Sequence, residues 1–164
     1  MQTITSANTS INSNHAPKVY GMKAAIKIME GKSVIDIGGG KYDTAINAAA
    51  TYGTKVSIYD PYNRTAAHNK AVMKSKYDVA IISNVLNVIN DKDERIKVIQ
   101  LALQKAKIVL ITVYEGNKTG IGKQTGKDSW QENRQPDSYV EEIQCNLPGC
   151  FVKRQGKLII VKEK

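Results

Sequence analysis

Three consecutive glycines follow a short apolar run that contains one carboxylate. Residues 33–37 hold Asp36 among β-branched side chains, and Gly38, Gly39 and Gly40 come directly after this run. The pattern predicts a buried strand that ends in a tight turn. Glycines at a strand-to-helix turn let the backbone approach a ligand closely, at the positive end of the following helix. We therefore predict a ligand site at this turn.

A second acidic residue indicates what kind of ligand the turn would bind. Asp60 lies twenty residues after Gly40 and directly follows a second predicted strand, residues 55–59. In dinucleotide folds, an acidic side chain at this place accepts hydrogen bonds from the ribose hydroxyls. The glycine turn and Asp60 together predict a nucleoside-containing ligand at the carboxyl ends of the strands.

Two nucleoside cofactors compete for this site. A dinucleotide fold needs glycine or alanine at the third small position of the loop, where helix and strand pack tightly. Asp43 occupies that position here, where it would crowd the turn and repel a pyrophosphate. S-adenosylmethionine (SAM) instead carries an ammonium and a sulfonium group, which suit the carboxylates of Asp36 and Asp43. The residues favour SAM, with S-adenosylhomocysteine (SAH) as product, over a nicotinamide dinucleotide.

The elements that would position this site alternate along the chain. Further strands are predicted at residues 77–83 and 107–113, with a closing hairpin at 150–154 and 157–162. Helices are predicted at residues 19–29, 44–52, 64–74, 91–106 and 137–144. Strands that are apolar on both faces and alternate with helices indicate a sheet covered on both sides. The expectation is a compact three-layer α/β fold with about six strands, mostly parallel, and a C-terminal antiparallel hairpin.

Composition limits the class of protein. The 164 residues predict one domain at 17–164, preceded by a polar arm at 1–16 that is rich in Ser, Thr and Asn. The sequence shows no signal peptide and no apolar run long enough to cross a membrane, so we expect a cytoplasmic protein. The two cysteines and two histidines are too few and too far apart for a zinc site. No metal is expected.

The net charge makes nucleic acid a possible partner. Lysine and arginine exceed aspartate and glutamate by nine, but only four of the 24 basic residues are arginines. Such an excess favours encounters with phosphate backbones. A solvated lysine-rich surface explains the same composition equally well. The sequence leaves open whether the protein is a monomer or a homodimer.

The motifs resemble those of class I, Rossmann-like SAM-dependent methyltransferases. Residues 36–40 are similar to the first motif of that family, Asp60 to the acidic residue of its second, and residues 77–89 to its fourth strand and the following loop. The resemblance is strongest to small methyltransferase-like proteins of phages and mobile elements. It extends to methyltransferases associated with DNA phosphorothioation, which share the segments at 60–62 and 84–89. A phage-encoded protein would act in the cytoplasm of its bacterial host.

The resemblance implies a set of cofactor contacts. It implies SAM contacts from Asp36, Gly38, Gly40, Asp60 and Asn84, with Tyr62 and Val85 against the adenosine. The predicted cofactor-binding set also includes Gly39, Asp43 and Pro61. The side chains of Asn84 and Asn87 could equally cap the following turn.

The chain departs from the family beyond its second strand. Only sixteen residues lie between Asp60 and Tyr77, enough for one helix but not for helix, strand and helix. The third strand of the family is therefore expected to be missing, together with the acidic residue that binds adenine there. Six strands are expected in place of seven.

The methyl acceptor has no recognisable motif. Residues 83–86 match neither the Asp/Asn-Pro-Pro-Tyr/Phe motif of amino-methylating DNA enzymes nor the Pro-Cys of the cytosine-C5 enzymes. The remaining candidates lie at 114–136, in a long glycine-punctuated connection of the kind that can form a lid. The predicted substrate-binding residues are Tyr114, Lys123, Lys127, Trp130 and Arg134, and the predicted general bases are Glu115 and Asp128. Alternatively, Trp130 packs the loop onto the domain while the charges face water.

The sequence therefore predicts a SAM-dependent methyltransferase acting on an unidentified acceptor. The main alternative is a non-catalytic module on the same fold, which binds SAM or only a protein partner.

Overall fold

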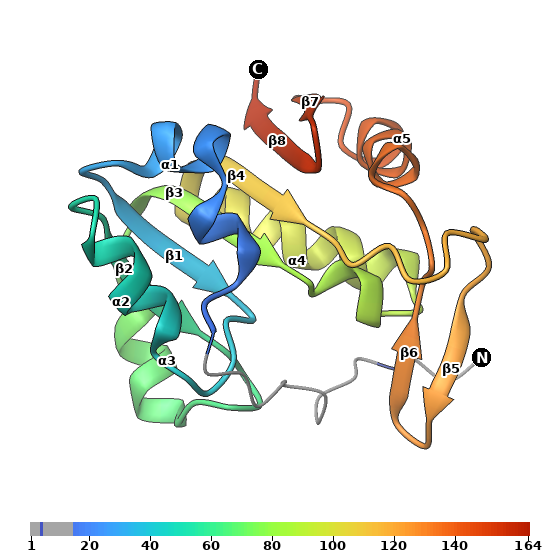
Figure 1. Ribbon diagram of the computed structural model, residues 1–164, viewed down its shortest axis with the longest axis horizontal. Coiled ribbons are helices and arrows are strands. Elements are labelled where there is room, and N and C mark those ends of the chain that lie inside the picture. Colours follow the sequence, from blue (N-terminus) through green and yellow to red (C-terminus); the bar gives the residue numbers. More distant parts are fainter. Residues whose placement is uncertain (1–3, 5–14) are drawn as a thin grey trace.

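The computed structural model describes Ile4 and residues 15–164. The polar arm predicted at residues 1–16 therefore lies outside the described residues, apart from Ile4, His15 and Ala16. Six strands form one sheet in the order β2-β1-β3-β4-β8-β7 (Figure 1). Their bounds are β1 Ser33–Ile37, β2 Lys55–Tyr59, β3 Tyr77–Ser83, β4 Ala106–Thr112, β7 Cys150–Gln155 and β8 Leu158–Glu163.

The sheet confirms the predicted fold class. β2, β1, β3 and β4 pair in parallel, whereas β8 is antiparallel to both β4 and β7. In the part of the chain that the structure describes, no strand lies beyond β2, as the short connection before Tyr77 predicted. The C-terminal hairpin supplies β7 and β8, so the sheet is mixed only at one edge.

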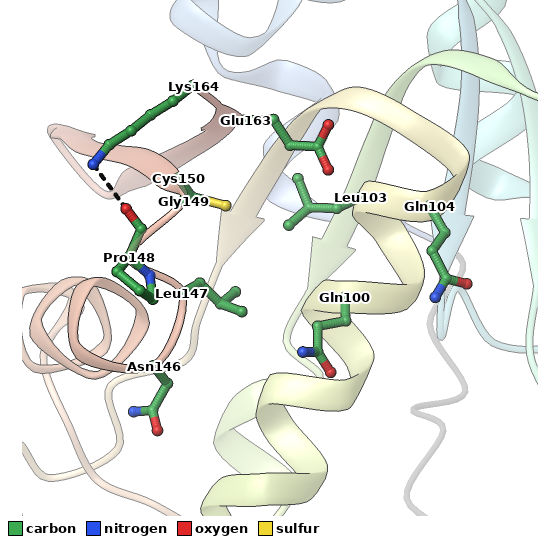
Figure 2. Close-up of a pocket in the computed structure, with 10 residues that line it drawn as sticks. All are labelled: Gln100, Leu103, Gln104, Asn146, Leu147, Pro148, Gly149, Cys150, Glu163 and Lys164. Carbon is green, nitrogen blue, oxygen red and sulfur yellow. Dashed lines mark hydrogen bonds between the residues drawn. The ribbon is translucent and has the colours of Figure 1, made fainter.

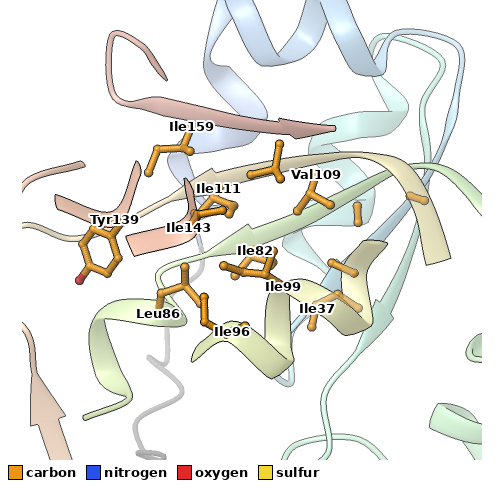
Figure 3. Packing of buried hydrophobic residues seen from close by; sticks show 14 of the residues in the cluster. Ile37, Ile82, Leu86, Ile96, Ile99, Val109, Ile111, Tyr139, Ile143 and Ile159 are labelled. Atoms are coloured by element: carbon orange, nitrogen blue, oxygen red, sulfur yellow. The ribbon is translucent and has the colours of Figure 1, made fainter. Parts of the chain in front are cut away.

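Helices cover both faces of the sheet. Their bounds are η1 Lys18–Gly21, α1 Lys23–Met29, α2 Thr44–Ala50, α3 Ala66–Val72, η2 Leu86–Val88, α4 Lys92–Lys105 and α5 Pro136–Asn146. The alternation of side chains along β4 separates two buried clusters. Val109 and Ile111 pack with α4 and α5 on one face (Figure 3), whereas Leu110 packs with η1, α1 and α2 on the other. Apolar burial on both faces explains why these strands read as continuous apolar runs.

Two regions differ from the predicted elements. The predicted helix 19–29 is split into η1 and α1 because Met22 is extended, with φ −79° and ψ 121°. The connection after β4 contains a separate two-stranded hairpin, β5 Lys123–Gly126 and β6 Ser129–Gln131. The sequence did not predict this hairpin because its strands are short and polar and have no apolar alternation.

Within Ile4 and residues 15–164, no helix is long and apolar enough to cross a membrane.

Candidate functional site

The glycine turn lies where the direction of the chain across the sheet reverses. The chain passes from β1 to β2 on one side and then returns to β3 on the other side of β1. In open α/β sheets, ligands bind at this switch point, outside the carboxyl ends of the strands. The loops after β1 and β3 touch there, because a Cβ on Gly38 would lie 2.6 Å from Cγ2 of Val85. Gly38 also has a φ of +77°, which favours glycine.

Asp36 is a buried carboxylate with one unsatisfied oxygen. Its side chain is 1% exposed, and its Oδ2 accepts a hydrogen bond of 2.5 Å from the hydroxyl of Tyr20. Its Oδ1 has no hydrogen-bond partner among the residues that the structure describes. Burial raises the pKa of Asp36 to about 6, and Asp60 adds to this, while the hydrogen bond from Tyr20 and the charge of Arg64 act in the opposite direction. A buried acceptor that the chain leaves unsatisfied needs a donor from elsewhere.

Gly39 brings the backbone directly over this carboxylate. A Cβ at this position would lie 2.8 Å from Cγ2 of Ile58 and 2.9 Å from Cγ of Asp36. Any larger residue would therefore displace one of these two groups. The turn requires glycine here because the chain passes so close to Asp36.

The N–H groups of the three glycines already have partners. Gly38 and Gly39 both donate to the carbonyl of Tyr59, at 2.7 and 3.4 Å, and Gly40 donates to Oδ2 of Asp60 at 2.9 Å. A pyrophosphate would need such N–H groups to be free. The glycine turn instead presents an unsatisfied carboxylate oxygen, which favours a cationic ligand group over a phosphate.

Asp60 holds two loops together and retains limited capacity for a ligand. Its Oδ1 accepts hydrogen bonds from the backbone of Tyr62 and Asn63, both at 2.9 Å, and from the amide of Asn63 at 3.1 Å. Among the described residues, only Gly40 donates to its Oδ2. Because a carboxylate oxygen can accept more than one hydrogen bond, Oδ2 can still accept one from a ligand hydroxyl. Pro61 and Tyr62 follow in an exposed turn, and the ring of Tyr62 is 58% exposed.

Arg64 was not predicted and is the residue that pairs with Asp43. Its Nη1 lies 2.8 Å from Oδ1 of Asp43, and its other nitrogens donate to the carbonyls of Gly40 at 2.8 Å and Tyr42 at 2.9 Å. Arg64 thus ties the glycine turn to the loop after β2. The carboxylate of Asp43 already has a cationic partner, so Asp36 is the carboxylate that remains for a ligand.

The loop after β3 supplies Asn84, Val85 and Asn87. Asn84 is exposed and has a left-handed backbone with φ 56°, while Val85 packs on Gly38. Asn87 is buried and joins two segments, because its amide donates to Gln131 at 3.2 Å and accepts from the N–H of Tyr114 at 3.4 Å. Asn87 therefore fixes the base of the β5–β6 hairpin beside the end of β4.

The predicted acceptor residues have different environments. Tyr114 is 63% exposed just after β4, and Lys123, Lys127 and Asp128 belong to the exposed part of the hairpin. Glu115 is paired with Lys157 at 2.9 Å and with Lys118 at 3.6 Å. The hydrogen bond from Lys157 lowers the pKa of Glu115, despite partial burial, and this weakens it as a base.

Trp130 and Arg134 make internal contacts. The indole N–H of Trp130 donates to Glu132 at 3.0 Å, and its ring packs so tightly on Gly122 that a Cβ there would lie 2.3 Å from it. Arg134 is 2.8 Å from Glu142. The contacts of Trp130 with Gly122 and Glu132 lie within the segment 114–136, whereas Arg134 joins this segment to α5.

A buried ion network at the base of the hairpin was not predicted. Arg95, only 4% exposed, forms two hydrogen bonds of 2.8 Å with Glu142 and one of 3.1 Å with Glu132. The network joins α4, α5 and the segment after β6. Arg95 lies on the predicted helix 91–106, but its partners are 37 and 47 residues away, which no local pattern reveals.

No metal centre is found among the residues that the structure describes: no three His, Cys, Asp or Glu side chains are grouped so that they could hold an ion.

The comparisons with known proteins establish the fold. No protein-family profile matches the chain, and no curated protein matches its sequence. Among solved structures, magnesium protoporphyrin IX methyltransferase from Synechocystis PCC 6803 with bound SAM has a TM-score of 0.55 at 15% identity, over 90% of this chain and 77% of that one. The chain has the fold of class I methyltransferases.

Other solved methyltransferases show the same fold. The sugar N-methyltransferase KedS8 from Streptoalloteichus matches with a TM-score of 0.57 at 9% identity, over 95% of this chain and 97% of that one. An O-methyltransferase family protein from Burkholderia thailandensis matches with a TM-score of 0.54 at 15% identity, over 89% of this chain and 53% of that one. The structural neighbours are thus SAM-dependent methyltransferases of several kinds.

In this version of the methyltransferase fold, α3 covers the edge strand. The ring Nε2 of His68 lies 2.7 Å from the carbonyl of Ile58. Asn69 accepts from the N–H of Asp60 at 3.2 Å and donates to its carbonyl at 2.8 Å. Side chains of α3 therefore satisfy backbone groups at the end of β2, where a further strand would otherwise follow.

Proposed function

We propose that the protein is a SAM-dependent methyltransferase that acts on an acceptor still to be identified. The observation that carries this proposal is the free Oδ1 of Asp36, a buried carboxylate oxygen under the glycine turn at the switch point of the sheet. The neighbouring N–H groups are occupied, so the turn suits an ammonium group rather than a phosphate.

The residues present fit SAM. Asp36 would hold the ammonium group, the glycines would allow close approach of the ligand, and Oδ2 of Asp60 would accept a ribose hydroxyl. Asn84, Tyr62 and Val85 remain the proposed neighbours of the adenosine. When bound, SAM supplies an electrophilic methyl group, whose bond to sulfur breaks as the bond to the acceptor forms, leaving SAH.

The chain's own contribution on the acceptor side comes from Tyr114 and the β5–β6 hairpin. Methyl transfer mainly needs an aligned acceptor and a base only where the acceptor must lose a proton. Asp128 and Glu115 remain the proposed bases, although Lys157 weakens Glu115 in this role. Tyr114, Lys123 and Lys127 are exposed and can reach an acceptor without breaking an internal contact that holds the hairpin.

A non-catalytic module that binds SAM is the second candidate. It is favoured by the internal contacts of Trp130 and Arg134, two residues predicted to hold an acceptor. The closer similarity to phage proteins and to phosphorothioation-associated methyltransferases rests on two short segments and stays a prediction, as do a cytoplasmic location and the oligomeric state.

Transfer of a labelled methyl group separates the two candidates. Purified protein is incubated with methyl-labelled SAM and separate pools of nucleic acid, protein and small molecules. An enzyme labels one pool, Asp36→Asn abolishes this, and the exposed control Asp93→Asn retains it. A protein that binds SAM but labels none of the pools is the non-catalytic module.

A further inference from the structure

A row of lysines lies along the amino edge of the sheet, which is the edge where the parallel strands begin. Each of the neighbouring strands β2, β1, β3, β4 and β8 has at least one lysine at this edge, either within the strand or directly beside its end. The antiparallel strand β8 brings its C-terminal end to the same edge, because Lys162 pairs with Ile108 near the start of β4. The lysine row consists of Lys32, Lys55, Lys74, Lys76, Lys105, Lys107, Lys162 and Lys164.

The strand register places these lysines side by side. Ser33 pairs with Lys55, so Lys32 and Lys55 stand at the starts of adjacent strands. Tyr77 pairs with Ala106, which brings the residues before β3 next to those at the start of β4. With about 4.8 Å between neighbouring strands, the row from β2 to β8 extends over roughly 19 Å. The row is therefore a continuous feature of one edge.

This edge holds much of the net charge of the protein. Eight lysines face only three carboxylates, those of Glu30, Asp78 and Glu163, an excess of five in a chain of net charge +9. Asp78 is itself bound by Ser33, whose N–H and hydroxyl donate to it at 2.9 and 2.8 Å. None of the eight lysines forms an ion pair with a residue that the structure describes, although Lys97, Lys118 and Lys157 elsewhere on the described surface do. The described carboxylates therefore leave the positive charge of this edge without ion pairs.

An exposed aromatic ring and a hollow of mixed polar and apolar lining adjoin one end of the row. Phe151 is 62% exposed, pairs with Lys162 across the hairpin, and has Nζ of Lys164 at 5.7 Å from its ring centroid. Figure 2 shows the hollow, which lies between the ends of α4, α5 and β8. Its lining includes the amide side chains of Gln100, Gln104 and Asn146. Amides donate and accept hydrogen bonds as the edges of nucleobases require.

We propose that this edge binds single-stranded nucleic acid, with the lysine row along the phosphate backbone and a base stacked on Phe151. Proteins that bind single strands without sequence preference combine a basic track with exposed aromatic rings. Lysines act as point charges, so they hold phosphates without reading sequence. A membrane surface would call for a large apolar face beside the lysines, whereas Phe151 is the single exposed large apolar residue on the described part of β7 and β8. The surface lies at the opposite edge from the glycine turn and is independent of the proposed function.

The test measures binding of a fluorescent single-stranded oligonucleotide by anisotropy at several salt concentrations. The row variant is Lys55→Gln, Lys76→Gln and Lys107→Gln. The matched control removes the same charge from exposed lysines away from this edge, with Lys18→Gln, Lys23→Gln and Lys92→Gln. The row variant should bind at least about 10-fold more weakly, and its salt slope should be lower by about 2. The affinity of the control for the oligonucleotide should fall by less than about 3-fold, because its lysines attract the oligonucleotide only at long range.

Phe151→Ala tests the stacking separately from charge. We expect affinity for the oligonucleotide to fall about 5- to 100-fold with the salt slope unchanged. Equal losses in the row variant and the control, or unchanged binding in Phe151→Ala, would overturn the proposal. So would binding to anionic lipid vesicles without binding to the oligonucleotide. Circular dichroism of each variant checks that the exposed substitutions leave the fold intact.

Discussion

The hydroxyl of Tyr20 lies 2.5 Å from Oδ2 of Asp36, and this contact joins η1 to the carboxyl end of β1. Both side chains are buried, with exposed fractions of 3% and 1%. Burial raises the pKa of Tyr20 well above its ordinary value, so the hydroxyl remains a donor at any physiological pH. Tyr20 therefore fixes one oxygen of Asp36 and leaves the other for a ligand.

Replacing Asp36 by Asn should stabilise the ligand-free protein at neutral pH. The pKa of Asp36 is raised from 3.8 to about 6 on folding, so its contribution to stability is present below about pH 4 and is lost as the pH rises to about 6. Above about pH 6, the free energy of unfolding of Asp36→Asn should therefore be higher than that of the wild type by up to about 3 kcal/mol. Urea denaturation at pH 4 and pH 7.5 measures this. A difference between the two proteins that is the same at both pH values would contradict the assignment.

The affinity for SAM should depend on the ionisation of Asp36. Below about pH 6 the carboxylate becomes protonated, so affinity should fall as the pH decreases through this value. Tyr20→Phe removes a hydrogen bond that favours the ionised form, so the midpoint should move to higher pH. Tyr52→Phe is the control, because its hydroxyl donates to the carbonyl of Tyr20 at 3.3 Å. Calorimetric titrations between pH 5 and pH 8 give the midpoints, and equal midpoints in Tyr20→Phe and wild type would refute the positioning role.

Gly39→Ala should damage both the turn and ligand binding. The added Cβ would meet Ile58 at 2.8 Å and Asp36 at 2.9 Å, and overpacking of this kind costs about 1–3 kcal/mol. Gly149→Ala is the matched control, because a Cβ there has nothing within 4 Å. Thermal unfolding should show a lower midpoint for Gly39→Ala only. A midpoint equal to that of Gly149→Ala would mean that the turn is looser than described.

Arg95→Met should destabilise the protein strongly. The substitution leaves the carboxylates of Glu132 and Glu142 buried with fewer partners, and breaking a buried ion pair in this way costs about 3–5 kcal/mol. Lys97→Met on the same helix breaks an exposed pair with Glu94 and should leave the stability nearly unchanged, because exposed ion pairs contribute little. Denaturant unfolding compares the two, and similar losses in both would show that the network contributes little.

Local sequence patterns were sufficient for the six strands of the main sheet and indicated that the glycine turn and Asp60 lie together. Apolar runs such as 77–83 and 107–113 appear as β3 and β4 within one residue, because strands buried on both faces need continuous apolar sequence. The glycine turn and Asp60 were predicted together, and Asp60 indeed accepts a hydrogen bond from Gly40. The strands and the glycine turn are recognisable within a few residues, and Asp60 follows the turn at the spacing that this fold requires.

Contacts between distant residues were not predictable from the sequence. Tyr20 was assigned to a helix, yet its role depends on Asp36, sixteen residues later. One signal was available, because an aspartate inside the apolar strand 33–37 requires a buried donor. Arg64 and the network around Arg95 gave no such signal, since a charged residue on a helix or loop is normally solvated. The hairpin β5–β6 depends on Asn87 and Glu132, whose backbone hydrogen bond spans the loop.

The most direct test of the cofactor site is calorimetric titration of the purified protein with SAM and with SAH, with NAD as control. We predict micromolar binding of the first two, no binding of NAD, and loss of SAM binding in Asp36→Asn while that variant remains folded. A folded wild-type protein that binds neither SAM nor SAH, or one that binds NAD instead, would contradict the assignment of Asp36 and the glycine turn as a SAM site.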